Sequence, residues 1–123
     1  MSAGLVPLLH VTDLEGSIAF YEHLGLEPEG FFEQEGWLLW CRLRSETDAE
    51  LMLTLTGDPP HVHDHGDQPL LYLVADDLDS LRDQLTDAGI SAGAIEEQDG
   101  PGPRRELRIQ DPDGYAWMVA ERP

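Results

Sequence analysis

The sequence contains no lysine, one cysteine and no apolar run long enough to span a membrane. Its longest apolar stretches, at 5–11 and 70–75, fall far short of the roughly 20 residues that a membrane-spanning helix needs. The lone Cys41 excludes an internal disulfide framework and a metal site made only of thiolates. Because the N-terminus shows no basic segment followed by a long apolar block, we expect no secretory signal and a cytoplasmic location.

Acidic residues far outnumber basic ones in this sequence. Twenty-five Asp and Glu side chains face only seven basic ones, all arginine, which leaves a net charge of −18. Such a chain repels nucleic acid and anionic membranes, so neither is an expected partner. The same field concentrates a cationic small molecule where the acids line a concavity. A solvated acidic surface that only aids solubility is the alternative.

Segments 13–25 and 77–89 of the sequence, 64 positions apart, follow one pattern. Each begins with Asp, continues with apolar residues at helical spacing and ends at a glycine suited to a left-handed helix terminus. Both are predicted to be amphipathic helices. Thr12 and Glu15 have the spacing of a capping box for the first, and Asp76 or Asp77 is expected to cap the second.

The predicted fold class is α+β: two βαβββ modules whose curled mixed sheets enclose a cleft. The strands are expected at 5–11, 27–32, 37–44, 50–55, 69–75, 91–96, 105–110 and 115–121. We expect a single domain over residues 1–123, with module 1 at about 1–56, a linker at about 57–68 and module 2 at about 69–123. Because a module of this size buries little apolar surface by itself, a homodimer is also expected.

Three stretches of the sequence carry a family resemblance: PLLHVTDLEGSIAFYEHLG at 7–25, LVADDLDSL at 73–81 and RELRIQDPDGY at 105–115. Together they resemble the glyoxalase, bleomycin-resistance protein and extradiol dioxygenase superfamily, also called the vicinal oxygen chelate proteins. The resemblance spans nearly the whole chain. It implies the fold without fixing an activity.

Metal-dependent members of that superfamily bind a divalent ion through His, Gln or Glu on four strands. The matching positions in this sequence are all apolar: Val6, Met52, Leu70 and Met118. A hard divalent ion needs imidazole nitrogen or carboxylate oxygen, and Glu50, two places from Met52, rescues one ligand at most. The resemblance therefore implies a metal-free protein without a cofactor, closest in character to the bleomycin-resistance branch, and no catalytic residue is assigned.

The leading interpretation is a protein that sequesters a small aromatic or cationic compound, with antibiotic resistance as one possible outcome. Alternation places His10 on the same strand face as Val6, and Tyr72 on the same face as Leu70. The alternative to ligand contact is contact with water or the backbone for His10, and packing in the core for Tyr72. Hairpin 31–40 combines aromatic rings with carboxylates, and its two tryptophans cannot both face the cleft unless the strand bends. The candidate ligand-binding residues are His10, Phe32, Trp37, Trp40, Met52, Tyr72 and Met118.

Other chemistry remains open as an alternative. His61, His63 and His65 share a face on an extended chain, and three imidazoles suit zinc, copper or nickel. Cys41 next to Arg42 is a thiolate nucleophile if the cation lowers its pKa, or otherwise a small buried apolar residue. The alternative function is a metal-dependent lyase, isomerase or dioxygenase of the same superfamily with a relocated metal site; a partner or regulatory module is the third.

Overall fold

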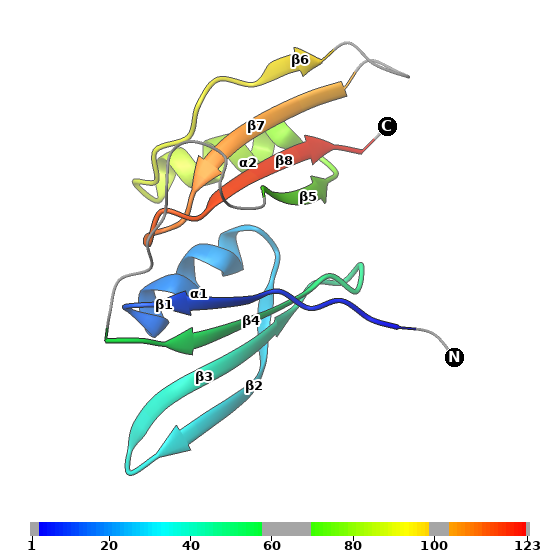
Figure 1. Ribbon diagram of the computed structural model, residues 1–123. Helices are drawn as coiled ribbons and strands as arrows, with labels where there is room; N and C mark the ends of the chain where they lie inside the picture. Colours follow the sequence, from blue (N-terminus) through cyan, green and yellow to red (C-terminus); the bar gives the residue numbers. More distant parts are fainter. Residues whose placement is uncertain (1–2, 58–69, 99–103, 123) are drawn as a thin grey trace. The chain divides into compact units, whose positions relative to one another are not determined.

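The computed structural model describes residues 3–57, 70–98 and 104–122 and divides the chain into two compact units, residues 1–61 and 62–123. Each unit contains a strand, a helix and three further strands, in the order that the repeat predicts (Figure 1). The elements of unit 1 are β1 (Leu8–Val11), α1 (Leu14–His23), β2 (Glu27–Gln34), β3 (Trp37–Arg44) and β4 (Glu50–Leu55). Those of unit 2 are β5 (Leu71–Ala75), α2 (Leu78–Asp87), β6 (Glu96–Gln98), β7 (Arg104–Gln110) and β8 (Ala116–Glu121).

Both units build the same mixed sheet of four strands. The strand order is β1-β4-β3-β2 in unit 1 and β5-β8-β7-β6 in unit 2. In each sheet the first strand of the unit pairs in parallel with the last, and the other neighbours are antiparallel. The predicted α+β class with two βαβββ modules is therefore confirmed, whereas the homodimer stays a prediction.

An aspartate side chain caps each helix. The Oδ1 atoms of Asp13 and Asp77 each accept a hydrogen bond of 3.1 Å from the backbone N–H three residues further on. The predicted capping box of Thr12 and Glu15 is wrong by one position, because the extended cap conformation belongs to Asp13 (φ −136°, ψ 95°). Of the two candidates for the second helix, Asp77 is the cap.

The chain reverses where the sequence predicts turns. Gly25 and Gly89 end the helices with φ of +86° and +78°, in the left-handed region. Glu35 and Gly36 join β2 to β3 with φ of 53° and 82°, as a two-residue hairpin turn requires. Gly114, with φ of +93°, closes the turn before β8.

The largest differences from the predicted strands are in β1 and β6. The first strand begins at Leu8 rather than at residue 5. Pro7 has no N–H to donate, and only its carbonyl joins the sheet, where it accepts a 2.9 Å hydrogen bond from the Met52 N–H. The predicted strand at 91–96 is wrong, because β6 starts only at Glu96. The segment 91–95 consists mostly of Ala, Gly and Ser, which have little preference for extended pairing.

In each unit the helix packs on one face of the sheet and forms the core there (Figure 1). The buried strand residues of unit 1 are Leu9, Val11, Cys41, Leu43, Leu51 and Leu53. Those of unit 2 include Leu107, Ile109, Trp117 and Val119, which pack under Leu78, Leu81 and Leu85 of α2. Because strand side chains alternate, the residues between them form the opposite face, which we call the open face of each unit. No helix in the described part of the chain is long and apolar enough to cross a membrane.

Adjacent strands of unit 1 provide a test of which face is the core. Leu53 is fully buried, whereas Leu8 on the open face is 46% exposed. We expect Leu53→Ala to lower the free energy of unfolding by about 2–5 kcal/mol, since it leaves a cavity. Leu8→Ala, the matched control, is expected to cost about 0.5–1 kcal/mol. Chemical denaturation of the two variants measures both values, and equal losses would contradict the assignment of faces.

Candidate functional site

The open face of unit 1 brings together residues that lie far apart in the sequence. The strand register aligns His10 with Thr54, Thr54 with Trp40 and Trp40 with Phe32 across all four strands. Phe32 is 54% exposed, so its ring is available to a ligand. Gly30 leaves room beside the indole, because a Cβ at that position would lie 3.8 Å from Cζ3 of Trp40. Three of the predicted ligand-binding residues thus form a single row.

A second row crosses the middle of this open face. Here Leu8 is aligned with Met52, Met52 with Arg42 and Arg42 with Gly30. The row is apolar except for the guanidinium, whose Nε is buried without a hydrogen-bond partner among the described residues. Met52, a predicted ligand-binding residue, therefore lies next to a cation rather than next to carboxylates.

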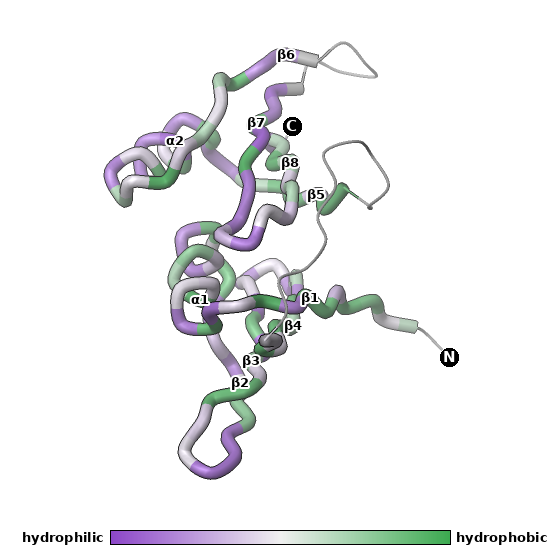
Figure 2. Tube along the Cα trace, turned by 60° about the vertical axis from the view of Figure 1, so that its left-hand side comes forward, coloured by the Kyte–Doolittle hydropathy of each residue, from purple (hydrophilic) through white to green (hydrophobic). Residues whose placement is uncertain are grey.

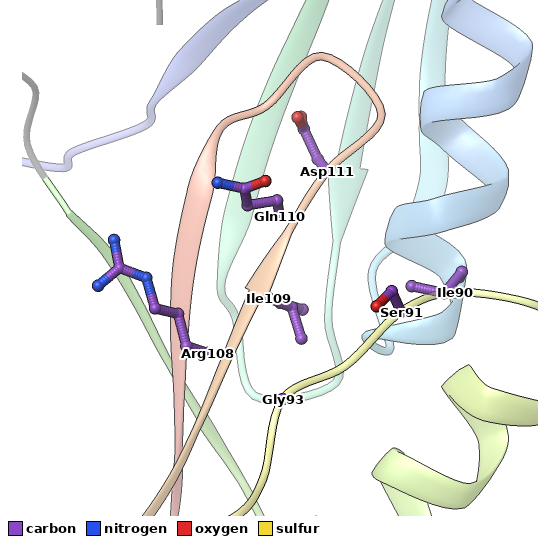
Figure 3. Close-up of a pocket in the computed structure, with 7 residues that line it drawn as sticks. All are labelled: Ile90, Ser91, Gly93, Arg108, Ile109, Gln110 and Asp111. Atoms are coloured by element: carbon purple, nitrogen blue, oxygen red, sulfur yellow. The ribbon is translucent and has the colours of Figure 1, made fainter. Parts of the chain in front are cut away.

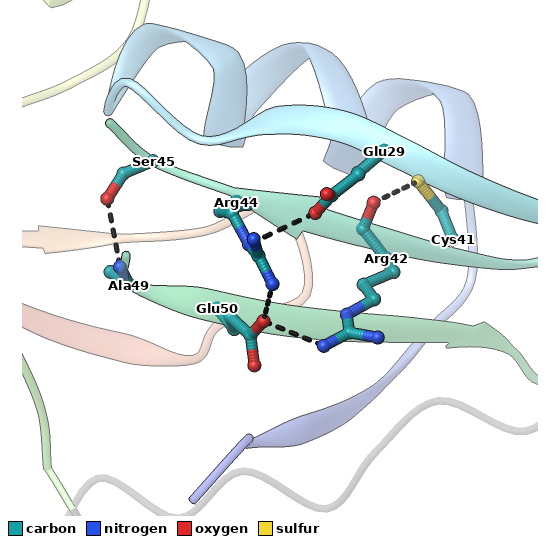
Figure 4. Close-up of polar contacts among 7 residues, drawn as sticks. All are labelled: Glu29, Cys41, Arg42, Arg44, Ser45, Ala49 and Glu50. Carbon is teal, nitrogen blue, oxygen red and sulfur yellow. Dashed lines mark hydrogen bonds and ion pairs between the residues drawn. The ribbon is translucent and has the colours of Figure 1, made fainter. Parts of the chain in front are cut away.

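The far end of the same face is an ion-pair group (Figure 4). Glu50 accepts hydrogen bonds from Nη2 of Arg42, at 2.7 Å, and from Nη2 of Arg44. Arg44 also lies 3.2 Å from Glu29. Hydrogen bonding from Arg44, and then from Arg42, lowers the pKa of Glu50 below its usual range, and the same contacts raise the pKa of Arg44. Two carboxylates and two guanidiniums pair here, and Glu27, which is aligned with Arg44, adds a further negative charge to this face.

The open face of unit 2 is similar but less aromatic. Tyr72, 45% exposed, is aligned with Met118, which is aligned with Arg108. The Tyr72 hydroxyl donates a 2.8 Å hydrogen bond to Oε1 of Glu106. Both predicted residues of this unit, Tyr72 and Met118, share the face, and the exposure of Tyr72 removes the alternative that its ring is part of the core.

The register places Trp37 on the same face of the sheet as Trp40. It shifts between Phe32 and Glu33, so that Leu39 is an extra residue in β3 and Trp37 is aligned with Gln34, two places from Phe32. Trp37 follows the hairpin turn and lines a pocket with the first turn of α1. Figure 2 shows the hairpin tip as hydrophilic next to a hydrophobic stretch of β2. The sequence contains no signal for the register shift, which is why it left the two tryptophans unassigned.

A pocket of about 470 Å³ in unit 2 was not predicted (Figure 3). It lies between the loop after α2 and the end of β7, with Ile109 directed toward Ser91 and Arg108 directed away. Asp111 at its rim stabilises the turn before β8, because its Oδ1 accepts hydrogen bonds from the backbone N–H groups of Asp113 (3.0 Å) and Tyr115 (2.8 Å). The pocket is lined by two isoleucines, Ile90 and Ile109, together with Ser91 and Gln110.

A sequence profile of the Glyoxalase/Bleomycin resistance protein/Dioxygenase superfamily matches residues 5–119. The chain belongs to this superfamily. Among curated proteins, no sequence matches it significantly.

Solved structures show the same fold at low sequence identity. A glyoxylase/bleomycin resistance protein/dioxygenase domain from Frankia sp. EAN1pec is 18% identical, with a TM-score of 0.76 over 100% of this chain and 94% of that one. TioX from Micromonospora sp. ML1 is 20% identical, with a TM-score of 0.69 over 98% and 97%. A bleomycin-binding protein complexed with bleomycin is 22% identical, with a TM-score of 0.69 over 99% and 100%.

The side chains at the four positions that the resemblance predicts to match the superfamily's metal ligands do not fit a divalent ion. Met52 and Met118 lie on the open faces and offer thioethers, while Val6 and Leu70 precede β1 and β5. A hard ion binds oxygen or imidazole nitrogen in preference to any of these groups. Glu50, the nearest carboxylate on the strand of Met52, is already held by two arginines.

Among the residues that the structure describes, one other cluster of carboxylates is compact enough to bind an ion. Asp77, Asp79 and Glu121 place their oxygens within 4.8 Å of one another at the start of α2. Arg105 donates two 2.9 Å hydrogen bonds to Asp79 and lies 3.5 Å from Glu121, whose other contact is the Leu78 N–H at 3.0 Å. Hydrogen bonding from Arg105 lowers the pKa of Asp79. Asp77 thus caps α2, and Arg105 neutralises Asp79 and Glu121. The proposed metal ligands His61, His63 and His65 lie outside the described residues.

Cys41 is not an activated thiol. It is fully buried in the core of unit 1, where desolvation, with a smaller contribution from Glu22, raises its pKa to about 11. The alternative in which Arg42 lowers this pKa is wrong, because the Arg42 guanidinium is on the open face and bonded to Glu50. The interpretation as a small buried residue is the one the structure supports.

This environment predicts slow thiol chemistry. At pH 8 we expect the folded protein to react with a disulfide reagent such as DTNB at least about 100-fold more slowly than the urea-unfolded chain, because so little thiolate is present. Stopped-flow absorbance measures both rates, with free cysteine in the same urea concentrations as the control. Rapid reaction of the folded protein would contradict the buried position of Cys41.

Proposed function

We propose that the chain binds a small planar aromatic compound on the open face of unit 1 and sequesters it without chemical change. The observation that carries this proposal is the row of Phe32, Trp40, Thr54 and His10 across the sheet. Two rings provide stacking surface, while a hydroxyl and an imidazole provide polar contacts to orient a guest. Stoichiometric binding is enough to confer resistance when the guest is an antibiotic.

The superfamily and its fold neighbours support a binding role. One neighbour is a bleomycin-binding protein complexed with bleomycin, and another is a bleomycin resistance determinant encoded on a transposon. The net charge of −18 raises the local concentration of a cationic guest. On the open face of unit 1, however, Arg42 and Arg44 are paired with Glu50 and Glu29, so ring contact provides most of the affinity there.

Tyr72 and Met118 on the open face of unit 2 are proposed as a second contact surface. Tyr72 adds an aromatic ring and Met118 an adaptable apolar side chain. We also propose that the chain acts as a homodimer, because each unit exposes large apolar side chains on its open face, among them Leu8, Leu70 and Tyr72.

Phe31 and Phe32 form a matched pair for testing the binding face. Phe31 aligns with buried Cys41 and Phe32 with Trp40, although the two rings are similarly exposed, at 55% and 54%. We expect Phe32→Ala and Trp40→Ala each to weaken binding about 3–10-fold, since an aromatic contact contributes about 0.5–1.5 kcal/mol. Phe31→Ala is expected to leave affinity within about twofold.

The measurement is calorimetry of the protein against a panel of planar natural products, both neutral and cationic. A ligand in the micromolar range whose affinity depends on Phe32 and not on Phe31 supports the proposal. Equal losses for the two phenylalanine variants, or no micromolar ligand from the panel, would count against it.

Removal of metal ions provides a second test. Because the four superfamily positions offer no hard donor atoms, we expect EDTA to leave ligand affinity unchanged and untagged protein to contain less than about 0.1 equivalent of transition metal. Elemental analysis of the wild type and of a His61, His63, His65→Ala variant is the measurement. Stoichiometric metal lost in that variant, or EDTA-sensitive turnover of a thiol adduct or catechol, would favour the enzymatic alternative.

A further inference from the structure

We propose that the open face of unit 2 recognises a planar aromatic acid, and that Arg108 is the residue that binds its carboxylate. The inference rests on the proposed function in taking this face as a contact surface, and it adds the chemical class of the guest. Its basis is a comparison of corresponding positions in the two units, where the same arginine has a carboxylate partner in unit 1 and a methyl group in its place in unit 2.

In unit 1 a carboxylate of the chain itself holds the arginine of the open face. Arg42, aligned with Met52, donates a 2.7 Å hydrogen bond from Nη2 to Oε1 of Glu50, two places before Met52 on β4. The register aligns Glu50 with Arg44, which donates a second hydrogen bond to the same oxygen. This end of the sheet therefore shows where a carboxylate fits beside two side-chain donors.

Unit 2 keeps two donors at this place but lacks the carboxylate. Arg108 is aligned with Met118, and Gln110 with Ala116, in the antiparallel register that β3 and β4 have in unit 1. Ala116, two places before Met118, therefore takes the position of Glu50. Figure 3 shows the side chains of Arg108 and Gln110 directed to the same side of β7. A guanidinium and an amide can thus donate to a carboxylate that comes from a ligand.

Arg108 has no ion pair among the residues that the structure describes, although the chain contains 25 Asp and Glu. Arg82 donates a 3.0 Å hydrogen bond to the carbonyl of Gly93. The arginines that pair with carboxylates are Arg42, Arg44, Arg105 and Arg122. An exposed guanidinium without such a partner, in so acidic a chain, leaves its strongest hydrogen bonds to an anion from outside.

Apolar side chains on the same face provide a surface for the aromatic ring. Tyr72 is 45% exposed and aligned with Met118, so Met118 lies between the phenol ring and the strand of Arg108. The Tyr72 hydroxyl is bonded to Glu106 at 2.8 Å, which holds the ring in place. From β5 to β7 is two strand spacings, roughly 10 Å, a span that suits a carboxylate attached to two fused rings.

The acids of this face leave the site accessible to an anion. Glu96 and Glu106 are aligned with each other, and Glu106 lies on the side of Arg108 away from Gln110. The carboxylate of a guest is therefore expected between Arg108 and Gln110. More distant charges contribute little, because physiological salt screens them over about 8 Å. An amine of the same shape would instead lie against the guanidinium.

Calorimetry of the intact protein with 2-naphthoate, at pH 7 and physiological salt, tests the inference. We expect 2-naphthoate to bind at least about tenfold more tightly than 2-naphthamide, a neutral compound of the same shape. Arg108→Gln is expected to remove this preference, so that the two compounds bind within about twofold of each other. Arg122→Gln, the matched control, removes the same charge from an arginine paired with Asp76 and should keep the preference.

A second variant rebuilds the carboxylate of unit 1 in unit 2. Ala116→Glu supplies Arg108 with an internal partner, so we expect it to weaken 2-naphthoate binding about tenfold with little effect on 2-naphthamide. Gln84→Glu adds the same charge on the exposed side of α2 and is expected to change both affinities by less than about twofold. Urea denaturation checks that each variant is folded, and Arg108→Gln, at an exposed position, carries the test if Ala116→Glu is not.

The outcomes separate this inference from the proposed function. Equal affinity for the acid and the amide, a preference that survives Arg108→Gln, or no binding of 2-naphthoate would overturn the inference. Binding of both probes that depends on Phe32 and not on Arg108 would leave the proposed function standing while the inference failed. Loss of the preference in Arg108→Gln and in Ala116→Glu, but in neither control, supports it.

Discussion

Each unit consists of a four-stranded sheet and one ten-residue helix. Because a single helix covers only one of the two faces of the sheet, the rest of the structure depends on what happens at the other face. The helix buries one face of the sheet, where residues such as Leu43, Leu53 and Val119 are inaccessible to water, and each such side chain contributes roughly 1.5–3 kcal/mol by burial. Nothing in the same unit covers the opposite face over the described residues. Large apolar side chains nevertheless lie there, including Phe32, Leu8 and Tyr72. An apolar surface maintained outside the core is typical of a surface that binds something.

Arginine is scarce in this chain, so its placement decides the local electrostatics. With seven arginines against 25 acidic groups, the carboxylates cannot each have an arginine of their own, and the ion pairs among the described residues involve particular carboxylates. Glu50 has two guanidiniums, and Asp79 and Glu121 share Arg105. These carboxylates are thereby removed as ligands for a metal ion. The hairpin and the first turn of α1, which have no arginine, retain their negative field.

The helices were predictable because their signals are local. Residues 14–23 and 78–87 carry the same apolar spacing between an aspartate and a glycine, and both became helices at those positions. The capping box failed because Thr12 and Asp13 are both competent caps, and only the backbone conformation decides between them. The strand at 91–96 failed because pairing with β7 depends on tertiary contact rather than on the preferences of small residues.

The candidate site was predictable only in part, for a similar reason. Parity predicted that His10 shares a face with Val6, and Tyr72 with Leu70. The register aligns His10 with Thr54 and Tyr72 with Met118, while Val6 and Leu70 precede the paired strands. It did not place Trp37, because the shift between Phe32 and Glu33 arises from pairing between two strands. The pocket beside Ser91 and Ile109 had no sequence signal, since its wall combines the loop after α2 with the end of β7, two segments that only the fold brings together.

The open faces of the two units disfavour a bound cation in the same way, because each places an arginine opposite a methionine. Met52 is aligned with Arg42 in unit 1, and Met118 is aligned with Arg108 in unit 2. At each of these two predicted metal positions the hard donor is missing and an arginine lies on the adjacent strand. Either feature by itself weakens ion binding, and together they add a Coulombic cost to the lack of ligands. Because the same pairing occurs in both halves of the repeat, the open faces favour rings and hydrogen-bond acceptors, and cations are better placed where arginine is absent.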